Sequence, residues 1–252
     1  MTLLITGGAS GIGAATARLA TARGHKVAIN YRSREAEAQK VVTDITAKGG
    51  QAVALPADVA READIGRLFE AAEKALGPIT HVVNSAGISA SSRVEDFDAA
   101  VLVKLFAVNA VGLMLCCREA ARRMSTRRGG KGGVIVNVSS MAATIGGRPA
   151  ASAYAASKAA VDSFTMGFAK EVAPEGIRAV SLRPGMIETE MTERTLADRE
   201  VRAAIESTIA MGRVGQAQEI ANAILWLLSD EASFISGVTL DASGGGFVFG
   251  KR

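Results

Sequence analysis

Short apolar runs alternate with longer helical patterns along the whole sequence, and this alternation limits the possible fold more than any other feature. The runs are rich in β-branched residues and apolar on both sides, as strands are when helices cover both faces of a sheet. We expect strands at residues 3–6, 26–30, 51–58, 80–87, 134–140, 177–185 and 237–243, and helices at 12–23, 34–48, 61–75, 96–127, 154–173 and 216–229. This order predicts an α/β fold, with a doubly wound parallel sheet between two layers of helices.

A glycine-rich turn follows the first predicted strand and opens the first predicted helix. In this turn, "TGGASGIG" (6–13), Gly7 permits a tight turn, Gly11 lets the backbone approach a diphosphate, and Gly13 permits close packing of the helix on the strand. The helix N-terminus would present free N–H groups to the anion. Because the turn lies between a strand and a helix, it predicts a dinucleotide site in a Rossmann-type fold.

The end of the second predicted strand indicates which dinucleotide is bound. Folds that bind NAD place an acidic residue there to hold the ribose 2′-hydroxyl, whereas this strand ends "NYRSRE" (30–35). Tyr31 stands where the acid is expected, and the guanidinium of Arg32 can bind a 2′-phosphate. We therefore expect NADP rather than NAD. The alternative is that Arg32 and Arg34 only cover the start of a surface helix.

A phenol and an ammonium group occur four residues apart in "AYAASKAA" (153–160), with only small side chains between them. Residues at this spacing share one helix face, with Cβ atoms about 5–6 Å apart. Acid–base chemistry near neutral pH requires the pKa of Tyr154 to fall by about 3 units. A cation at about 4 Å supplies most of this change, and an oxidised nicotinamide nearby would add to it. The pair predicts that Tyr154 is a general acid or base with Lys158 beside it.

These motifs resemble those of the short-chain dehydrogenase/reductase family, in its single-domain branch, over essentially the whole chain. Further matches are "ADV" (57–59), "NSAG" (84–87), in which a serine replaces the family's second asparagine, and "RPG" (183–185) with the threonine that follows at 189. The resemblance implies a catalytic tetrad of Asn109, Ser140, Tyr154 and Lys158. Ser140 precedes Tyr154 by one residue more than is common in the family, so Ser139 is an alternative for its role.

The resemblance also implies what each residue does. Tyr154 would protonate a carbonyl oxygen as hydride reaches the carbon, or act as the base in reverse, and Ser140 would hydrogen-bond the same oxygen. Lys158 would also hold the nicotinamide ribose, and Asn109 would anchor a water of a proton relay. The residues expected to contact the cofactor are Gly7, Ser10, Gly11, Ile12, Gly13, Tyr31, Arg32, Asp58, Val59, Asn84, Ala86, Gly87, Tyr154, Lys158, Pro184, Gly185, Ile187 and Thr189.

We therefore expect an NADP-dependent oxidoreductase that interconverts a ketone or aldehyde and an alcohol on a small or medium substrate. One alternative is a reductase of 3-oxoacyl thioesters, with Arg127, Arg128 and Lys170 as a basic rim for an acidic carrier protein. A second is a sugar dehydrogenase, favoured by the polar segment 186–212 and by the few aromatic residues. A third, which is not an enzyme, is an NADP-sensing binding protein.

Two other segments predict movement and assembly. The charged segment 186–212 is long for a connection between a strand and a helix, and such segments are often lids. Small residues recur on the helix that carries Tyr154, at Ala156, Ala160, Ser163 and Gly167. By resemblance, this helix and the one at 96–127 would build a dimer interface, and the C-terminal "LDASGGG" (240–246) would complete a homotetramer.

Composition limits the remaining possibilities. The 252 residues are 48% hydrophobic and 21% charged, without a linker or repeat, so we expect a single domain over 1–252. The N-terminus lacks the features of a signal peptide, and the longest apolar run, "LFAVNAVGLMLCC", is interrupted by Asn109 and too short to span a bilayer. The adjacent Cys116 and Cys117 are interpreted as reduced thiols. These features predict a cytoplasmic protein that does not enter a membrane.

The net charge of +4 is mildly basic, and the basic residues gather between positions 118 and 131. We interpret them as solvated cations at a helix C-terminus, or as a landing patch for an anionic substrate or carrier. No motif or aromatic platform accompanies them, so we expect no nucleic-acid partner. His25 and His81 have no further ligand at metal spacing, so we expect no metal site.

Overall fold

Seven parallel strands form the central sheet of the protein, in a computed structural model that describes residues 1–246. Their spatial order is β3-β2-β1-β4-β5-β6-β9, and every pairing in this sheet is parallel. The strands are β1 (Thr2–Thr6), β2 (Lys26–Tyr31), β3 (Gln51–Pro56), β4 (Ile79–Asn84), β5 (Gly133–Val138), β6 (Ile177–Pro184) and β9 (Thr239–Ala242). The predicted α/β fold with a doubly wound sheet is confirmed.

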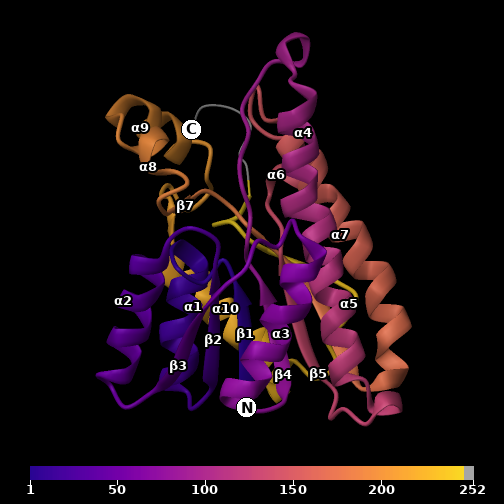
Figure 1. Cartoon of the computed structure of the whole chain (residues 1–252). Helices are drawn as coiled ribbons and strands as arrows, with labels where there is room; N and C mark the ends of the chain where they lie inside the picture. The colour runs from indigo at the N-terminus through magenta and orange to yellow at the C-terminus, as the bar shows by residue number, and fades with distance from the viewer. Residues whose placement is uncertain (247–252) are drawn as a thin grey trace.

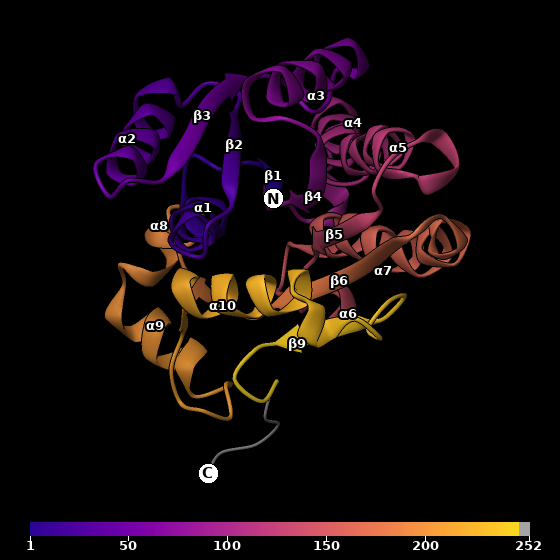
Figure 2. The ribbon, with the colours of Figure 1, turned by 90° about the horizontal axis from the view of Figure 1, so that it is seen from below.

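Helices cover both faces of this sheet (Figure 2). One layer contains α1 (Gly11–Ala22), α2 (Glu35–Thr46) and α10 (Ala217–Leu228), and the other contains α3 (Glu62–Leu76), α5 (Leu113–Met124) and α7 (Ser152–Val172). Consecutive β1 side chains point to opposite faces of the sheet. Leu3 and Ile5 pack in the core under the first layer of helices, and Leu4 packs in the core under the second. All three are 0% exposed, which explains why the strands are continuous apolar runs in the sequence.

Several strands end one to three residues earlier than predicted, and two of these differences affect the site. β4 ends at Asn84 rather than at residue 87, and β5 ends at Val138 rather than at residue 140. The small residues that follow have left the sheet and form loops at its carboxyl edge. This difference matters because these loops carry several predicted site residues.

The single helix predicted at 96–127 is interrupted in the structure. It consists of α4 (Ala99–Phe106), a π-helical turn (Ala107–Gly112), α5 and a 3₁₀ turn (Thr126–Arg128). The π-helical turn lies where the chain packs tightly, because a Cβ added at Gly112 would lie 2.3 Å from the Val59 carbonyl oxygen. Turns of this kind are frequent at functional sites, and this one contains Asn109.

The continuous helical run Ala99–Met124 is long and apolar enough to cross a membrane by length and composition, and an 18-residue window within it has a mean hydropathy of 2.2. The sequence argument that this region is too short to span a bilayer is therefore wrong. Length and composition alone are weak evidence for a membrane span, because core helices of soluble proteins share them. Leu113, Cys116 and Cys117 from this run pack in the core beneath the sheet.

The predicted insertion at 186–212 is folded. It contains β7 (Ile187–Glu188), α8 (Glu193–Leu196) and α9 (Arg199–Glu206), and β7 pairs with β8 (Gly215–Gln216). Leu196, Ile205 and Ile209 pack with Val214 in a small core of their own. In Figure 1 this segment rises on one side above the carboxyl edge of the sheet, and α4 rises on the other. Closure of the segment over a ligand stays a prediction.

Two histidines lie near the opposite, amino-terminal edge of the sheet. The rings of His25 and His81 are in edge-to-face contact, with centroids 5.5 Å apart. The His81 Nε2–H donates to the Leu228 carbonyl oxygen at 3.3 Å. Burial lowers the pKa of His81 to about 4, and burial also lowers the pKa of His25. Among residues 1–246, no group of three or more His, Cys, Asp or Glu side chains is placed to hold a metal ion.

This histidine pair predicts a loss of stability in mild acid. The pKa of His81 is about 4 in the folded protein and about 6.5 in the unfolded chain, so the unfolded chain binds more protons between these values. The free energy of unfolding should therefore fall as pH falls from about 6.5 to about 4, with a contribution of about 3 kcal/mol from His81. Urea unfolding across this range measures the slope. His81→Gln should flatten it, and an equal slope in the variant would contradict the assignment.

Candidate active site

The loops after β1 and β4 meet where the strand order reverses, which is where open α/β sheets bind ligands. Gly7 has φ +66°, and a Cβ added there would lie 2.8 Å from the Cα atom of Ala86. The Ala86 N–H donates to the Thr6 hydroxyl at 3.2 Å. The glycine turn and the "NSAG" loop are therefore packed against each other, with backbone in close approach.

The glycine turn has the geometry that its sequence predicts. A Cβ added at Gly13 would lie 2.3 Å from the Gly7 carbonyl oxygen, so only glycine allows this packing of α1 on the turn. Gly11 has φ +50° and is partly exposed, as are Ser10 and Ile12. The Ser10 side chain makes no capping hydrogen bond to α1. The helix N-terminus thus keeps N–H groups that can donate hydrogen bonds to an anionic diphosphate. The turn therefore fits a dinucleotide.

The predicted adenosine side of the site lies at the ends of β2 and β3. Arg32 directly follows β2, is exposed, and makes no salt bridge within the described part of the chain. Burial and the negative charge of the nearby Glu35 raise the pKa of Tyr31. The Asp58 carboxylate accepts from the Ala60 N–H at 3.0 Å, and Val59 is buried. An exposed guanidinium thus follows the end of β2, and its contact with a 2′-phosphate stays a prediction.

Three members of the predicted tetrad come together at the N-terminal end of α7. The Ser140 side chain lies near enough to the Tyr154 hydroxyl to favour its ionised form and so lower its pKa. The Lys158 Nζ atom lies 6.0 Å from the centroid of the Tyr154 ring and donates to the Val138 carbonyl oxygen at 2.9 Å. Ser139 instead donates to the Lys158 carbonyl oxygen at 3.0 Å and is buried. The geometry therefore favours Ser140 over Ser139 as the partner of Tyr154.

The expected lowering of the Tyr154 pKa by Lys158 is not found. Burial raises the pKa of Tyr154, and the neighbouring Ser140 side chain opposes this increase. The ammonium is farther from the phenol than the sequence argument assumes, and burial lowers its own pKa to about 8. The protein's own groups therefore keep Tyr154 protonated at neutral pH, which is the form that a general acid needs.

Asn109, the fourth member, holds the loop after β4. Its side chain accepts from the Ile88 N–H and donates to the Ile88 carbonyl oxygen, both at 2.9 Å. It also donates to the Ser157 hydroxyl at 3.1 Å, and Ser157 in turn donates to the Tyr154 carbonyl oxygen at 2.7 Å. A Cβ added at Gly87 would lie 3.5 Å from both the Asn109 Oδ1 and the Lys158 Nζ atoms. Asn109 thus links the loop to the helix that carries Tyr154.

The side chain of Asn84 does not face the site. It is 2% exposed and donates to the Asn137 side chain at 2.9 Å, across the β4–β5 pair. The buried thiol of Cys117 lies within 3.4 Å of both asparagines, and burial raises its pKa to about 12. Asn84 can therefore reach a cofactor only through its backbone. Successive side chains along β4 point to opposite faces of the sheet. Because Val83 packs in the first core, Asn84 points to the other face.

The predicted nicotinamide-side segment follows β6 and returns to the glycine turn. The Pro184 carbonyl oxygen accepts from the Met141 N–H at 3.0 Å, which ties this segment to the loop that carries Ser140. A Cβ added at Gly185 would lie 2.9 Å from the Cα atom of Ser243. Ile187 is buried, and Thr189 lies against Gly11. The N-terminal glycine turn and the segment after β6 thus lie against each other.

A buried ion pair beneath Lys158 is absent from the sequence prediction. Asp162, one turn after Lys158 on α7, is 4% exposed and accepts from the Ser181 hydroxyl at 2.6 Å and from Arg183 Nε at 2.7 Å. Its negative charge raises the pKa of Lys158, which partly offsets the effect of burial. The sequence does contain a sign of this contact, because a carboxylate four residues after a lysine lies on the same helix face. Asp162 therefore supports the positive charge of Lys158.

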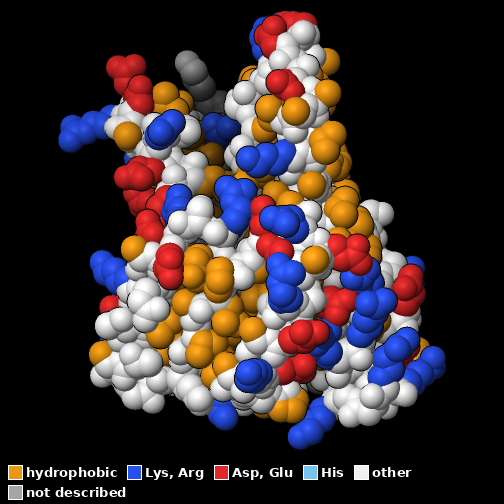
Figure 3. All heavy atoms as spheres, viewed as in Figure 1, with side chains coloured by type: hydrophobic (Ala, Val, Ile, Leu, Met, Phe, Trp, Pro, Cys, Tyr) orange, Lys and Arg blue, Asp and Glu red, His pale blue; other side chains and the backbone are white. Residues whose placement is uncertain are grey.

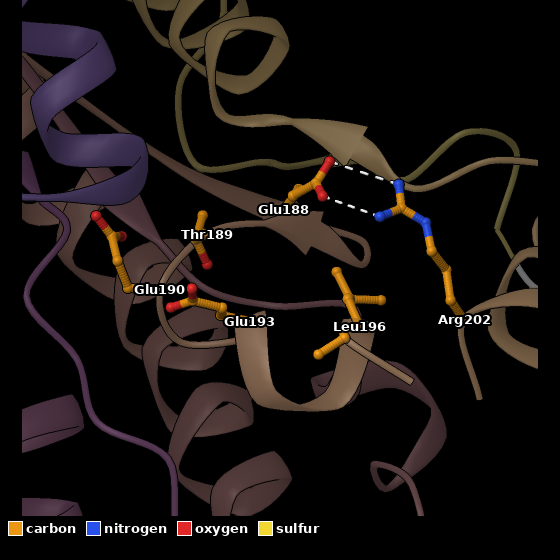
Figure 4. A pocket seen from close by; sticks show the side chains of 7 residues that line it. Glu188, Thr189, Glu190, Glu193, Leu196 and Arg202 are labelled. Atoms are coloured by element: carbon orange, nitrogen blue, oxygen red, sulfur yellow. Dashed lines mark hydrogen bonds and ion pairs between the residues drawn. The ribbon is translucent and has the colours of Figure 1, made fainter. Parts of the chain in front are cut away.

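A cavity of about 460 Å³ opens beside the glycine turn (Figure 4). Its lining residues come from the segment after β6 and are Glu188, Thr189, Glu190, Glu193, Leu196, Ala197 and Arg202. Arg202 pairs with Glu188 on one side of the cavity at 2.9 Å. All seven lining residues belong to the segment 186–212, and a role of this segment as a lid stays a prediction.

Comparison with known proteins places the chain among oxidoreductases. A family model described as "Enoyl-(Acyl carrier protein) reductase" matches residues 7–246. The uncharacterized oxidoreductase YgfF of Escherichia coli is 44% identical over 96% of this chain and 98% of its own. A 3beta-hydroxysteroid dehydrogenase of Eggerthella lenta is 39% identical over 99% of this chain and 97% of its own. The crystal structure of a dehydrogenase/reductase from Sinorhizobium meliloti has a TM-score of 0.90 at 34% identity, over 97% of this chain and 94% of that one.

The fold, the site and these similarities define an oxidoreductase of the type that uses NAD(P) and acts on CH–OH groups. The chain belongs to the short-chain dehydrogenase/reductase family. Further relatives differ in their substrates. A 3-oxoacyl-[acyl-carrier-protein] reductase of Synechocystis is 34% identical over 98% of this chain and 96% of its own, and an L-rhamnose 1-dehydrogenase of Sphingomonas is 36% identical over the same shares.

Proposed function

We propose that this protein is an NADP-dependent reductase or dehydrogenase that interconverts a ketone or aldehyde and an alcohol, with Tyr154 as the acid and base. The observation that carries the proposal is the placement of Tyr154 beside Lys158 and Ser140, with Lys158 near Gly87 of the loop that packs on the glycine turn. Arg32 supports NADP over NAD, because its exposed guanidinium makes no salt bridge within residues 1–246. The bound dinucleotide supplies or accepts the hydride.

The protein's residues then move and hold the proton. In the reduction direction, Tyr154 donates its hydroxyl proton to the substrate oxygen, and Ser140 hydrogen-bonds that oxygen as negative charge develops on it. Lys158 places a positive charge beside the resulting phenolate, and Asp162 supports the charge of Lys158. Asn109 fixes the loop that faces these groups. In the oxidation direction, Tyr154 accepts the proton.

A substrate panel tests this proposal and its alternatives. The compounds are a simple diketone, a 3-oxosteroid, a 3-oxoacyl thioester, a 2-enoyl thioester and, with NADP, an aldose. Loss or gain of the absorbance of the reduced nicotinamide identifies turnover. The relatives favour the steroid, the thioester and the sugar, and Arg127, Arg128 and Lys170 would form the rim for an acidic carrier. Reduction of the enoyl thioester alone, or tight NADPH binding without any turnover, would contradict the proposal.

We also propose that the protein is a cytoplasmic homotetramer of single-domain subunits. Apolar side chains gather along α4 and the outer edge of the molecule in Figure 3, and Val103, Phe106, Val111 and Met166 are at least 36% exposed. The small residues Ala156, Ser163 and Gly167 are exposed on α7. These surfaces would pair two copies, and the region 240–246 would join two pairs.

Light scattering measures this assembly. We expect four chain masses at micromolar concentration, and Val103→Asp should reduce the mass because it places a charge in the paired apolar face. The mass of one chain in the unmodified protein would contradict the assembly.

A further inference from the structure

The carboxylate of Glu190 lies at the glycine turn, although Glu190 belongs to none of the sequence motifs. A Cβ added at Gly11 would lie 3.2 Å from the Thr189 Cγ2 atom and 3.6 Å from the Glu190 Oε2 atom. In Figure 4 the Glu190 side chain points toward α1, whereas Glu188 faces Arg202 across the cavity. A negative charge therefore lies beside the glycine whose backbone approaches the diphosphate in folds of this type.

The electrostatics of α1 explain this position. Ser10 precedes the helix in an extended conformation and makes no capping hydrogen bond, and no acidic residue lies in the first turn. The partial positive charge at a helix N-terminus attracts a carboxylate. Glu190 makes no salt bridge within residues 1–246, so no cation of this part of the chain compensates its charge. A diphosphate at the same helix end would meet this carboxylate as a like charge.

We propose that Glu190 weakens dinucleotide binding by opposing the diphosphate at the glycine turn. This inference rests on the proposed function. Binding must either displace the carboxylate toward solvent or proceed against its charge, and either event lowers affinity for every ligand with a diphosphate. The side chain is exposed, so water screens the repulsion. One like charge at about 5 Å in water changes affinity about fivefold.

The effect is distinct from the role proposed for Arg32. Arg32 would contact only the 2′-phosphate and so distinguish NADPH from NADH. Glu190 would act on the diphosphate, which both cofactors share with ADP-ribose. Removal of the Glu190 charge should therefore improve binding of all three ligands by the same factor.

Calorimetric titration with ADP-ribose tests the inference. At low salt, Glu190→Gln should bind ADP-ribose about fivefold more tightly than the unmodified protein, and Glu190→Lys should bind more tightly still. The gain should shrink near 1 M salt, where charges are screened within about 3 Å. Adenosine, which has no phosphate, should bind equally to all variants. Glu193→Gln is the matched control, because Glu193 lines the same cavity but does not lie against Gly11.

The outcomes separate this inference from the proposed function. Equal affinity in Glu190→Gln, weaker binding by that variant, or the same gain in Glu193→Gln would overturn the role of Glu190. Failure of the unmodified protein to bind ADP-ribose would contradict the proposed function, and the inference with it.

Discussion

Tyr154→Phe is expected to lower kcat about a hundredfold or more while the protein still binds NADPH. The variant keeps the aromatic ring and its packing beside Lys158 but removes the hydroxyl proton that Tyr154 would transfer to the substrate oxygen. Steady-state turnover on any active compound of the panel measures the loss. Fluorescence titration with NADPH checks that the cofactor site is intact. Near-normal turnover in this variant would contradict the proposed mechanism.

The two adjacent serines provide a matched comparison for this result. Ser140 lies beside the Tyr154 hydroxyl and acts to lower its pKa, whereas Ser139 donates to the Lys158 carbonyl oxygen and is buried. Ser140→Ala should therefore reduce turnover, because it removes a donor to the oxygen on which charge develops. Ser139→Ala should lower the free energy of unfolding and should retain more turnover than Ser140→Ala. A larger loss of turnover in Ser139→Ala than in Ser140→Ala would assign the catalytic role to Ser139.

Arg32→Ala is expected to weaken NADPH binding about ten- to a hundredfold, because a charge-assisted contact with the 2′-phosphate is lost. NADH has no phosphate at this position, so its binding should hardly change. The ratio of kcat/KM with the two cofactors measures the effect. The unmodified protein should prefer NADPH, more strongly at low salt. Adding Tyr31→Asp should move the preference toward NADH by supplying an acceptor for the ribose hydroxyl.

Arg34→Ala is the control for this experiment. Arg34 precedes α2, is exposed and makes no salt bridge within the described residues, as is true of Arg32. It is two residues farther from the end of β2, so its removal should leave the cofactor ratio unchanged. A preference of the unmodified protein for NADH, or equal losses with both cofactors in Arg32→Ala, would contradict the assignment of NADP.

The sequence predicted the fold well because its signals are local. Strands buried on both faces are apolar at every position, as Leu3, Leu4 and Ile5 show, and helices between them leave a parallel sheet as the simplest arrangement. The glycine turn could also be predicted, because a glycine is needed where backbone atoms only a few residues away leave no room for a Cβ atom. Gly13 packs against the Gly7 carbonyl oxygen, only six positions away.

The parts that the sequence could not predict depend on contacts between distant segments. The π-helical turn at Asn109 forms where its side chain pairs with the backbone of Ile88, and nothing in the helical pattern marks this pairing. Burial determines the pKa of Tyr154 more than the charge four residues away. The approach of Glu190 to Gly11 joins residues far apart in the chain, so only the folded structure brings them together.

Deuterium transfer from the cofactor to the substrate tests the central claim most directly. The protein is incubated with a ketone from the panel and with NADPH that carries deuterium at the transferable position of the nicotinamide, and the alcohol is analysed by mass spectrometry. The account predicts one deuterium on the carbinol carbon of each product molecule, with the hydroxyl proton drawn from solvent through Tyr154. An alcohol that contains no deuterium, or ketone that is bound beside NADPH but never reduced, would contradict it.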